Sequence, residues 1–249
     1  MTKSSTQTAD VPSSGTLIPS ATAIILHTVS KQEQFKVLLL KRNNKLKTHG
    51  GSWVFPGGKF DHKDYEQQDL SNTNRTYHLL SESECTLTAK VAAIRETYEE
   101  ANIQLNPDSL KLCSRWLTPE TMTRRFDAFF FIAESRDDTV AIDGSEIHDY
   151  QWISPQDALA QQRRGEIILP PPTFVSLNYL SGFEHAVSAI TEMTQKPIHF
   201  RPKLVNTDNG FCSLYEEDAG YLKADPNIEG SQHRLLLENG QYRYTKNAV

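Results

Sequence analysis

Three glutamates with helical spacing are the residues whose arrangement points most directly to chemistry. They lie in AAIRETYEEANI, residues 92–103, at Glu96, Glu99 and Glu100. On a helix these positions share one face, with Cβ atoms about 5–6 Å apart. Carboxylates so placed repel one another, and a bound divalent cation reverses that interaction. Ligation by carboxylate oxygens alone suits Mg²⁺ or Mn²⁺ better than zinc.

A glycine pair upstream is the second candidate element. Gly57 and Gly58 are adjacent in FPGGKFDHKD, and glycine lets the backbone approach a phosphate or a metal closely. Each element has an ordinary alternative, because acidic runs usually face water and a GG pair is a common turn. Arg95 lies four residues before Glu99, so it can pair with that carboxylate.

Together the two elements resemble the Nudix box, G-x5-E-x7-R-E-U-x-E-E-x-G-U, in which U is a bulky apolar residue. The matching positions are Gly58, Asp64 in place of the first Glu, Arg95, Glu96, Glu99, Glu100 and Ile103. Thr97 takes an apolar position, and Asn102 replaces the last glycine, which a left-handed helix cap tolerates. The largest departure from the motif is in spacing, because 30 residues separate Asp64 from Arg95 where the motif has seven. The free-energy cost of closing a loop grows only as the logarithm of its length, so such an insertion can be tolerated. A Nudix subgroup of coenzyme A diphosphatases has a similarly interrupted box.

A basic segment just before the glycines carries a second resemblance. Residues 38–58 are similar to the coenzyme A pyrophosphatase signature at Leu38, Leu39, Arg42, Gly50, Gly51, Phe55, Pro56, Gly57 and Gly58. Lys47 conserves the charge of a signature arginine. The segment contains a local basic patch that could hold substrate phosphates, formed by Lys41, Arg42, Lys45 and Lys47. The alternative is an edge strand and loop with solubilising lysines.

Three further residues are candidates on weaker grounds. Glu146 precedes Trp152 by six residues, in the region where many Nudix enzymes carry a distal acid; otherwise it is an exposed loop acid. Arg124 and Arg125 open an apolar strand, where they could contact a phosphate or a nucleotide; otherwise they lie on a solvated strand edge.

The resemblance implies a reaction and a role for each side chain. Glu96 and Glu100 would hold Mg²⁺ or Mn²⁺, with Glu99 completing the metal cluster. Glu99 or Glu146 would orient or deprotonate the attacking water. Arg95 would orient a glutamate, and the backbone at Gly57 and Gly58 would approach the metal.

The implied activity is hydrolysis of a nucleoside diphosphate linked to another moiety. The favoured substrate is coenzyme A or acyl-CoA, cleaved to 3′,5′-ADP and (acyl-)4′-phosphopantetheine. An ADP-ribose or NADH pyrophosphatase would use the same helix. A non-catalytic, Nudix-like nucleotide-binding regulatory domain is the alternative from a different class.

The resemblance implies an α/β/α sandwich with a mixed β-sheet between helices. We expect a hairpin from 21–28 and 35–42, strands near 110–118, 125–133 and 150–154, and a helix opened by Ser154-Pro155. The acidic helix is expected from Leu87 to Ala101, with Val91, Ile94, Tyr98 and Ala101 on its inward stripe.

Three segments flank or interrupt this domain. We expect a disordered leader at 1–19, the Nudix domain at 20–195 with an insertion at about 65–86, and a β-rich extension at 196–249. Hairpin turns are predicted in the extension at Asn209-Gly210 and Asn239-Gly240.

Composition limits the partners and the compartment. The 249 residues carry 26 Lys+Arg and 31 Asp+Glu, a net charge of −5, which argues against a general nucleic-acid or membrane-surface binder. No apolar run approaches the ~18 residues of a membrane helix. Three cysteines without metal spacing suggest reduced thiols, and the last three residues do not resemble the S-K-L peroxisomal address. We therefore expect a cytoplasmic protein with a small-molecule nucleotide substrate, and leave a homodimer open.

Overall fold

The computed structural model describes residues 16–28, 34–46, 49–66 and 77–247. The main sheet contains β1 (Leu17–His27), β2 (Lys36–Arg42), β3 (Trp53–Val54), β4 (Gly57–Lys59), β5 (Lys111–Leu117), β6 (Arg125–Ser135), β7 (Ile147–Ile153) and β8 (Ile198–Phe200). The helices are α1 (His62–Glu66), the 3₁₀ turn η2 (Tyr77–Leu79), α2 (Glu82–Ala101), α3 (Pro155–Arg163), α4 (Pro171–Leu180) and α5 (Ala186–Gln195). A second sheet contains β9 (Lys203–Thr207), β10 (Gly210–Leu214), β11 (Gln232–Glu238) and β12 (Gln241–Asn247).

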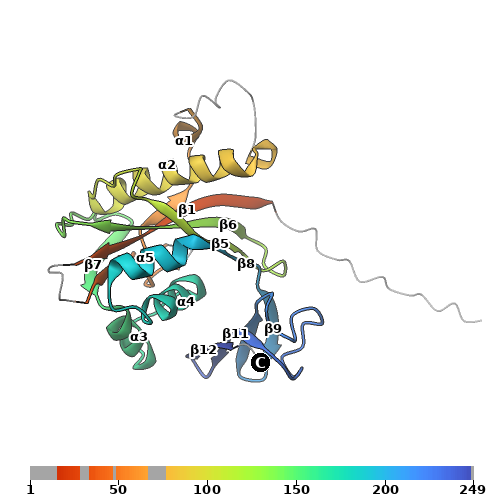
Figure 1. The fold of residues 1–249 in the computed structure, drawn as a ribbon. Helices are drawn as coiled ribbons and strands as arrows, with labels where there is room; N and C mark the ends of the chain where they lie inside the picture. The colour runs from red at the N-terminus through yellow and green to blue at the C-terminus, as the bar shows by residue number, and fades with distance from the viewer. Residues whose placement is uncertain (1–15, 29–33, 47–48, 67–76, 248–249) are drawn as a thin grey trace, which may run out of the picture.

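β1 organises the main sheet. It is parallel to β6 along its length and antiparallel to β2 and β4, and the path across the sheet is β3-β2-β1-β6-β5-β8. Its side chains alternate between two cores: Ala23 and Ile25 belong to the core under α2, Ile24 and Leu26 to the core under α4 and α5. Figure 1 shows α2 on one face of the sheet and α4 and α5 on the other. The expected α/β/α sandwich with a mixed sheet is therefore confirmed.

The acidic helix differs from its prediction in its start and in part of its buried face. α2 begins at Glu82, five residues before the expected Leu87, because Ser81 and Glu84 form a capping box. Its fully buried apolar residues are Ala89, Ala92, Ala93 and Ala101. The predicted inward stripe holds at Ala101 and at Ile94, which packs against the core. It was wrong at Tyr98, which is 54% exposed. Small alanines let the helix lie close to the sheet.

Other boundaries shift by a few residues. β1 begins at Leu17, inside the predicted leader, whose first fifteen residues lie outside the described part of the chain. The insertion is described only at its ends, because residues 67–76 also lie outside it. Ser154 caps α3 as expected, accepting a hydrogen bond from the backbone of Asp157 at 3.1 Å. The helix C-cap at Asn102 has φ 56°, the expected left-handed conformation.

The C-terminal residues form the expected antiparallel sheet. Its second hairpin turns at Asn239 and Gly240, with φ 50° and 78°, as a two-residue turn of type I′ requires. Its first hairpin turns one residue earlier than predicted, since Gly210 already belongs to β10. No helix within the described ranges is long and apolar enough to cross a membrane.

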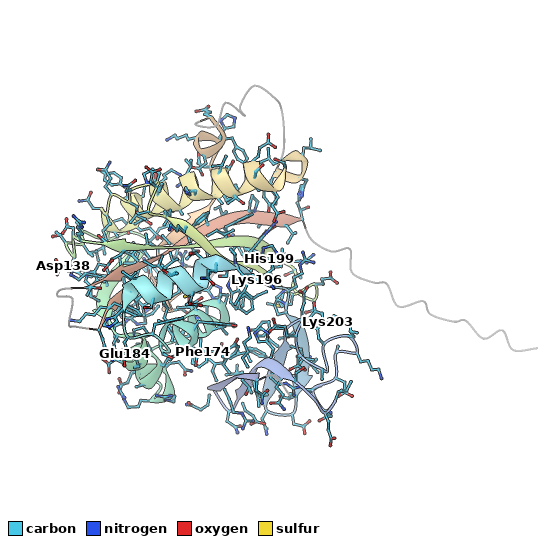
Figure 2. All side chains as sticks on the ribbon, in the orientation of Figure 1. Asp138, Phe174, Glu184, Lys196, His199 and Lys203 are labelled. Carbon is cyan, nitrogen blue, oxygen red and sulfur yellow. The ribbon has the colours of Figure 1, made fainter. Side chains whose placement is uncertain are left out.

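An aromatic cluster joins the small sheet to the α4 side of the main sheet. The rings of Phe174 on α4 and Tyr242 on β12 are 4.9 Å apart, and Phe200 stacks on Trp116 at 3.8 Å. Tyr244 donates a hydrogen bond to Tyr179 at 3.1 Å. Figure 2 labels Phe174 on α4 and Lys203 at the start of β9, where the chain enters the small sheet.

His233 makes the stability of this junction depend on pH. Its side chain is buried, and Nε2 lies 2.8 Å from the hydroxyl of Tyr244. Burial lowers the pKa of His233 to about 4; the charge of Lys246 adds to this, and Glu217 and Asp218 oppose it. In the unfolded chain a histidine titrates near pH 6.5. Between pH 6.5 and 4 the unfolded chain therefore gains a proton that the folded chain does not.

We expect acidification over this range to cost about 2–3 kcal/mol of folding stability through His233. Chemical denaturation at pH 7, 5.5 and 4.5 would compare wild type with His233→Gln, which has no titrating ring. The stability difference between the two proteins should shift by that amount in favour of the variant as the pH falls. Parallel pH profiles would contradict the assignment.

Candidate active site

Two carboxylates of α2 meet the backbone of β4. The Gly57 N–H donates to Oε2 of Glu100 at 2.9 Å, and the residue Glu100 is 5% exposed. A Cβ added at Gly58 would lie 2.2 Å from Oε1 of Glu96, and one at Gly57 would lie 2.4 Å from the carbonyl oxygen of Ala21 on β1. The glycine pair therefore lets β4 fit between β1 and the acidic face of α2.

Arg95 is the centre of the hydrogen bonds around these acids. Its Nε and Nη2 donate to the two carboxylate oxygens of Asp64, each at 2.9 Å. Its Nη1 donates to Glu96 at 2.8 Å and to Glu99 at 3.0 Å, and Nη2 also donates to the carbonyl of Lys59 at 3.0 Å. The hydrogen bonds to Asp64 are the main cause that raises the pKa of Arg95. Arg95 thus donates to both glutamates, and its role in orienting them for catalysis stays a prediction.

The insertion does not separate the two halves of the box. Asp64 is fully buried and accepts two hydrogen bonds from Arg95, although 30 residues lie between them in the sequence. At the other end of the insertion, Tyr77 donates its phenolic proton to Asp127 on β6. Tyr65 and Tyr77 both pack on Phe60, with ring centroids 6.0 and 5.9 Å from it. The two ends of the insertion are therefore held together beside β4.

An ion pair beside Tyr77, between Arg115 and Asp127, was not predicted from the sequence. Arg115 on β5 donates to Asp127 through Nε and Nη2, each at 2.7 Å. Its guanidinium lies 4.5 Å from the ring centroid of Phe129. The available signal was Asp127 itself, a charged residue inside the apolar run RFDAFFFIA of β6.

Strand pairing brings Arg42 and Glu146 to the same place. Arg42 on β2 is paired with Ile147 on β7, and the Asn43 N–H donates to the carbonyl of Glu146 at 2.8 Å. The Arg42 guanidinium lies 3.9 Å from Glu100 and 3.7 Å from Glu146. Arg42 therefore lies between two of the candidate acids, where a substrate phosphate would also meet it.

The remaining basic candidates are not assembled with these acids. Arg125 is opposite Leu17 on β1, whereas Gly57 is opposite Thr22, a separation of about 16 Å along the strand. The side chain of Arg125 is buried and directs Nε toward the carbonyl of Thr118 at 3.4 Å, and Arg124 lies 5.2 Å from the ring of Phe126. Contact of either arginine with a distant part of a nucleotide stays a prediction. Lys47 lies outside the described residues.

The electrostatics of the cluster favour a cation. Burial raises the pKa of Glu100 to about 8, and the charges of Glu96 and Glu146 add to this effect. Burial also raises the pKa of Glu96. Both carboxylates are thus held where their charged forms are disfavoured, and a nearby cation relieves that cost.

The carboxylate oxygens of Glu96, Glu99 and Glu100 are of the type that binds a hard divalent cation. In this structure arginines contact these oxygens. Among the side chains that the structure describes, no group of three or more His, Cys, Asp or Glu is arranged to hold a metal. Arg95 binds Glu96 and Glu99, and Arg42 lies near Glu100. Glu96 and Glu100 nevertheless both lie against the glycine backbone of β4, where neither glycine has a side chain to intervene. Their carboxylate oxygens are the type of ligand that Mg²⁺ or Mn²⁺ prefers.

The sandwich, with an acidic helix laid on a glycine strand, defines a Nudix fold. A solved NUDIX hydrolase from Alicyclobacillus acidocaldarius superposes with a TM-score of 0.61 and 21% identity, covering 74% of this chain and 100% of its own. At that identity the likeness establishes the fold.

The NUDIX domain profile matches residues 18–170, so the chain belongs to the Nudix family, whose hydrolases generally use divalent metal cations. An acyl-coenzyme A diphosphatase of Xenopus laevis is 24% identical over 289 aligned positions, covering 82% of this chain and 76% of the relative. A peroxisomal coenzyme A diphosphatase of Caenorhabditis elegans is 34% identical over 104 residues, covering 42% of this chain and 36% of the relative. Family and relatives together support a Nudix-type pyrophosphohydrolase.

Proposed function

We propose that this protein hydrolyses the diphosphate of coenzyme A or an acyl-CoA, giving 3′,5′-ADP and (acyl-)4′-phosphopantetheine. The observation that carries the proposal is the convergence of Glu96, Glu100 and Arg42 on the glycine strand. The coenzyme A preference is supported by the signature-like segment 38–58 and by the names of the two relatives.

The acids would divide the work between holding a cation and handling water. Glu96 and Glu100 are the ligands proposed for Mg²⁺ or Mn²⁺, with Glu99 completing the set. The cation, when bound, neutralises charge on the diphosphate oxygens. Glu99 and Glu146 have side chains 56% and 60% exposed, so either can reach a water molecule and accept its proton.

The two arginines would position the reacting groups. Arg95 keeps Glu96 and Glu99 on one side of its guanidinium. Arg42 would turn from Glu100 and Glu146 toward a phosphate oxygen, a contact in which its planar fork can be bidentate. Water then adds to phosphorus, one bridging P–O bond breaks, and the released phosphate oxygen keeps the bonding electrons.

The substrate distinguishes this proposal from its alternatives. Products from coenzyme A, acetyl-CoA, ADP-ribose and NADH, each with Mg²⁺ or Mn²⁺, would be identified by mass spectrometry. We expect 3′,5′-ADP from coenzyme A and its acetyl ester. Turnover of ADP-ribose with none of coenzyme A would reject the coenzyme A assignment, and nucleotide binding without turnover of any substrate would favour a regulatory domain.

The compartment and the assembly stay predictions. The free cysteines favour a cytoplasmic location, whereas one relative is named as peroxisomal. A homodimer is untested, and gel filtration with light scattering would decide it.

A further inference from the structure

The outward face of the C-terminal sheet is hollowed into a cavity of about 420 Å³. Its lining combines two arginines with hydroxyl, amide and aliphatic groups: Thr207, Cys212, Pro226, Gln232, Arg234, Leu236, Arg243 and Thr245. The volume falls in the range of small-molecule sites, about 300–1,000 Å³. The small sheet packs on the α4 side of the main sheet, whereas the acids of α2 lie on its opposite face (Figure 1), so this cavity is separate from the candidate active site.

Strand alternation explains the floor of the cavity. Leu235 points inward and is fully buried in the core shared with α4. Its neighbours point outward, so Leu236 of β11 lies beside its pairing partners Cys212 of β10 and Arg243 of β12 on the outer face. Cys212 is only 1% exposed although it lies on this outer face. The floor is therefore apolar where a solvated sheet would be polar.

Pro226 lines the cavity from the connection between β10 and β11, residues 215–231, and hydrogen bonds fix this connection in place. Asp218 has a fully buried carboxylate, which accepts hydrogen bonds from Nε and Nη2 of Arg234, each at 2.7 Å. It also accepts from the backbone N–H groups of Gly220 and His233, each at 2.9 Å. Arg234 in turn donates through Nη1 to the carbonyl of Pro226 at 2.6 Å. The cavity is thus preformed.

The polar groups around the cavity are predominantly donors. A guanidinium has five N–H donors, and the three contacts of Arg234 leave one N–H on each terminal nitrogen. Within the described residues Arg243 has no hydrogen bond or ion pair. Because Asp218 offsets the charge of Arg234, the uncompensated charge at the rim is that of Arg243.

We propose that this cavity is a second binding site, for a small anion that carries a phosphate group on an apolar or planar body of about nucleotide size. The phosphate would be held by Arg243 and the spare N–H groups of Arg234. The body would lie over Leu236. Such a site lets a phosphorylated metabolite bind the protein away from its acidic helix.

Metal-free full-length protein, with EDTA present, would be titrated with AMP, adenosine and inorganic phosphate by calorimetry. AMP should bind saturably at one site, inorganic phosphate should bind more weakly and compete with AMP, and adenosine should not bind detectably. Arg243→Gln should weaken AMP binding about tenfold or more, since it removes a charge-assisted contact.

Two controls locate the effect. Lys223→Gln removes one positive charge from the same connection without touching the cavity, and should bind AMP as wild type does. The double variant Glu96→Gln/Glu100→Gln should also bind AMP normally, which separates this site from the acids of α2. Wild-type affinity in Arg243→Gln, loss of binding in the double variant, or equal binding of adenosine and AMP would each overturn the proposal.

Discussion

Replacing Glu96 and Glu100 together by glutamine is expected to lower hydrolysis by about 10²–10⁴-fold and to make the metal-free protein more stable at pH 8. Loss of the two charged ligands removes several kcal/mol of charge stabilisation at the diphosphate, and each 1.36 kcal/mol is a factor of ten in rate. Glutamine keeps an oxygen that can accept the hydrogen bond from Gly57, so the local fold should survive.

The stability gain follows from the sign of the pKa shift. Burial raises the pKa of Glu100 to about 8, whereas the unfolded chain titrates near pH 4.3. Between these values the folded protein binds more protons than the unfolded chain, so its stability falls as the pH rises. Glutamine carries no charge and escapes that loss. The difference in unfolding free energy between variant and wild type should therefore grow from pH 5 to pH 8.

Steady-state rates with saturating Mg²⁺, calorimetric Mg²⁺ titration and denaturation at the two pH values measure the three effects. Glu184→Gln is the matched control, because Glu184 is exposed between α4 and α5 (labelled in Figure 2); it should leave rate, Mg²⁺ affinity and stability unchanged. If the double variant hydrolyses its substrate and binds Mg²⁺ as wild type does, the assignment of these acids fails.

Local patterns were enough to predict the acidic helix and the glycine pair beside it, and the family resemblance implied the sandwich around them. Glu96, Glu99 and Glu100 have helical spacing, and the strands on either side are short apolar runs with turn residues between them. The buried face of α2 was mispredicted because it is made of alanines, which carry little hydrophobic signal. Tyr98 supplied a stronger signal and points to solvent.

Contacts that depend on strand register could not be read from spacing. Arg42 reaches Glu146 only because β2 pairs with β7 in one particular register. Tyr77 reaches Asp127 across 50 residues, and nothing in the polar sequence of the insertion marks that tyrosine as an anchor. Conversely, Arg124 and Arg125 looked like site residues from their sequence alone, and the β1–β6 register places them away from the acids.

The pairing of Arg95 with Asp64 leads to the largest expected effect on stability. Arg95→Gln leaves the Asp64 carboxylate, 1% exposed, without its bidentate partner. An unpaired buried charge of this kind costs about 3–5 kcal/mol. Glu96 and Glu99 lose their orienting hydrogen bonds in the same variant, so hydrolysis should fall as well. Urea denaturation and steady-state kinetics measure the two losses separately.

A second substitution separates the contribution of Arg95 to stability from its contribution to activity. Adding Asp64→Asn removes the stranded charge, so the double variant should recover most of the lost stability and none of the lost activity. Arg164→Gln is the control, since Arg164 makes an ion pair of 2.6 Å with Glu166 at half-exposed positions, where such a pair contributes little to stability. If Arg95→Gln costs no more stability than Arg164→Gln, Asp64 is not paired across the insertion. If Asp64→Asn restores activity along with stability, Arg95 does not position the catalytic glutamates.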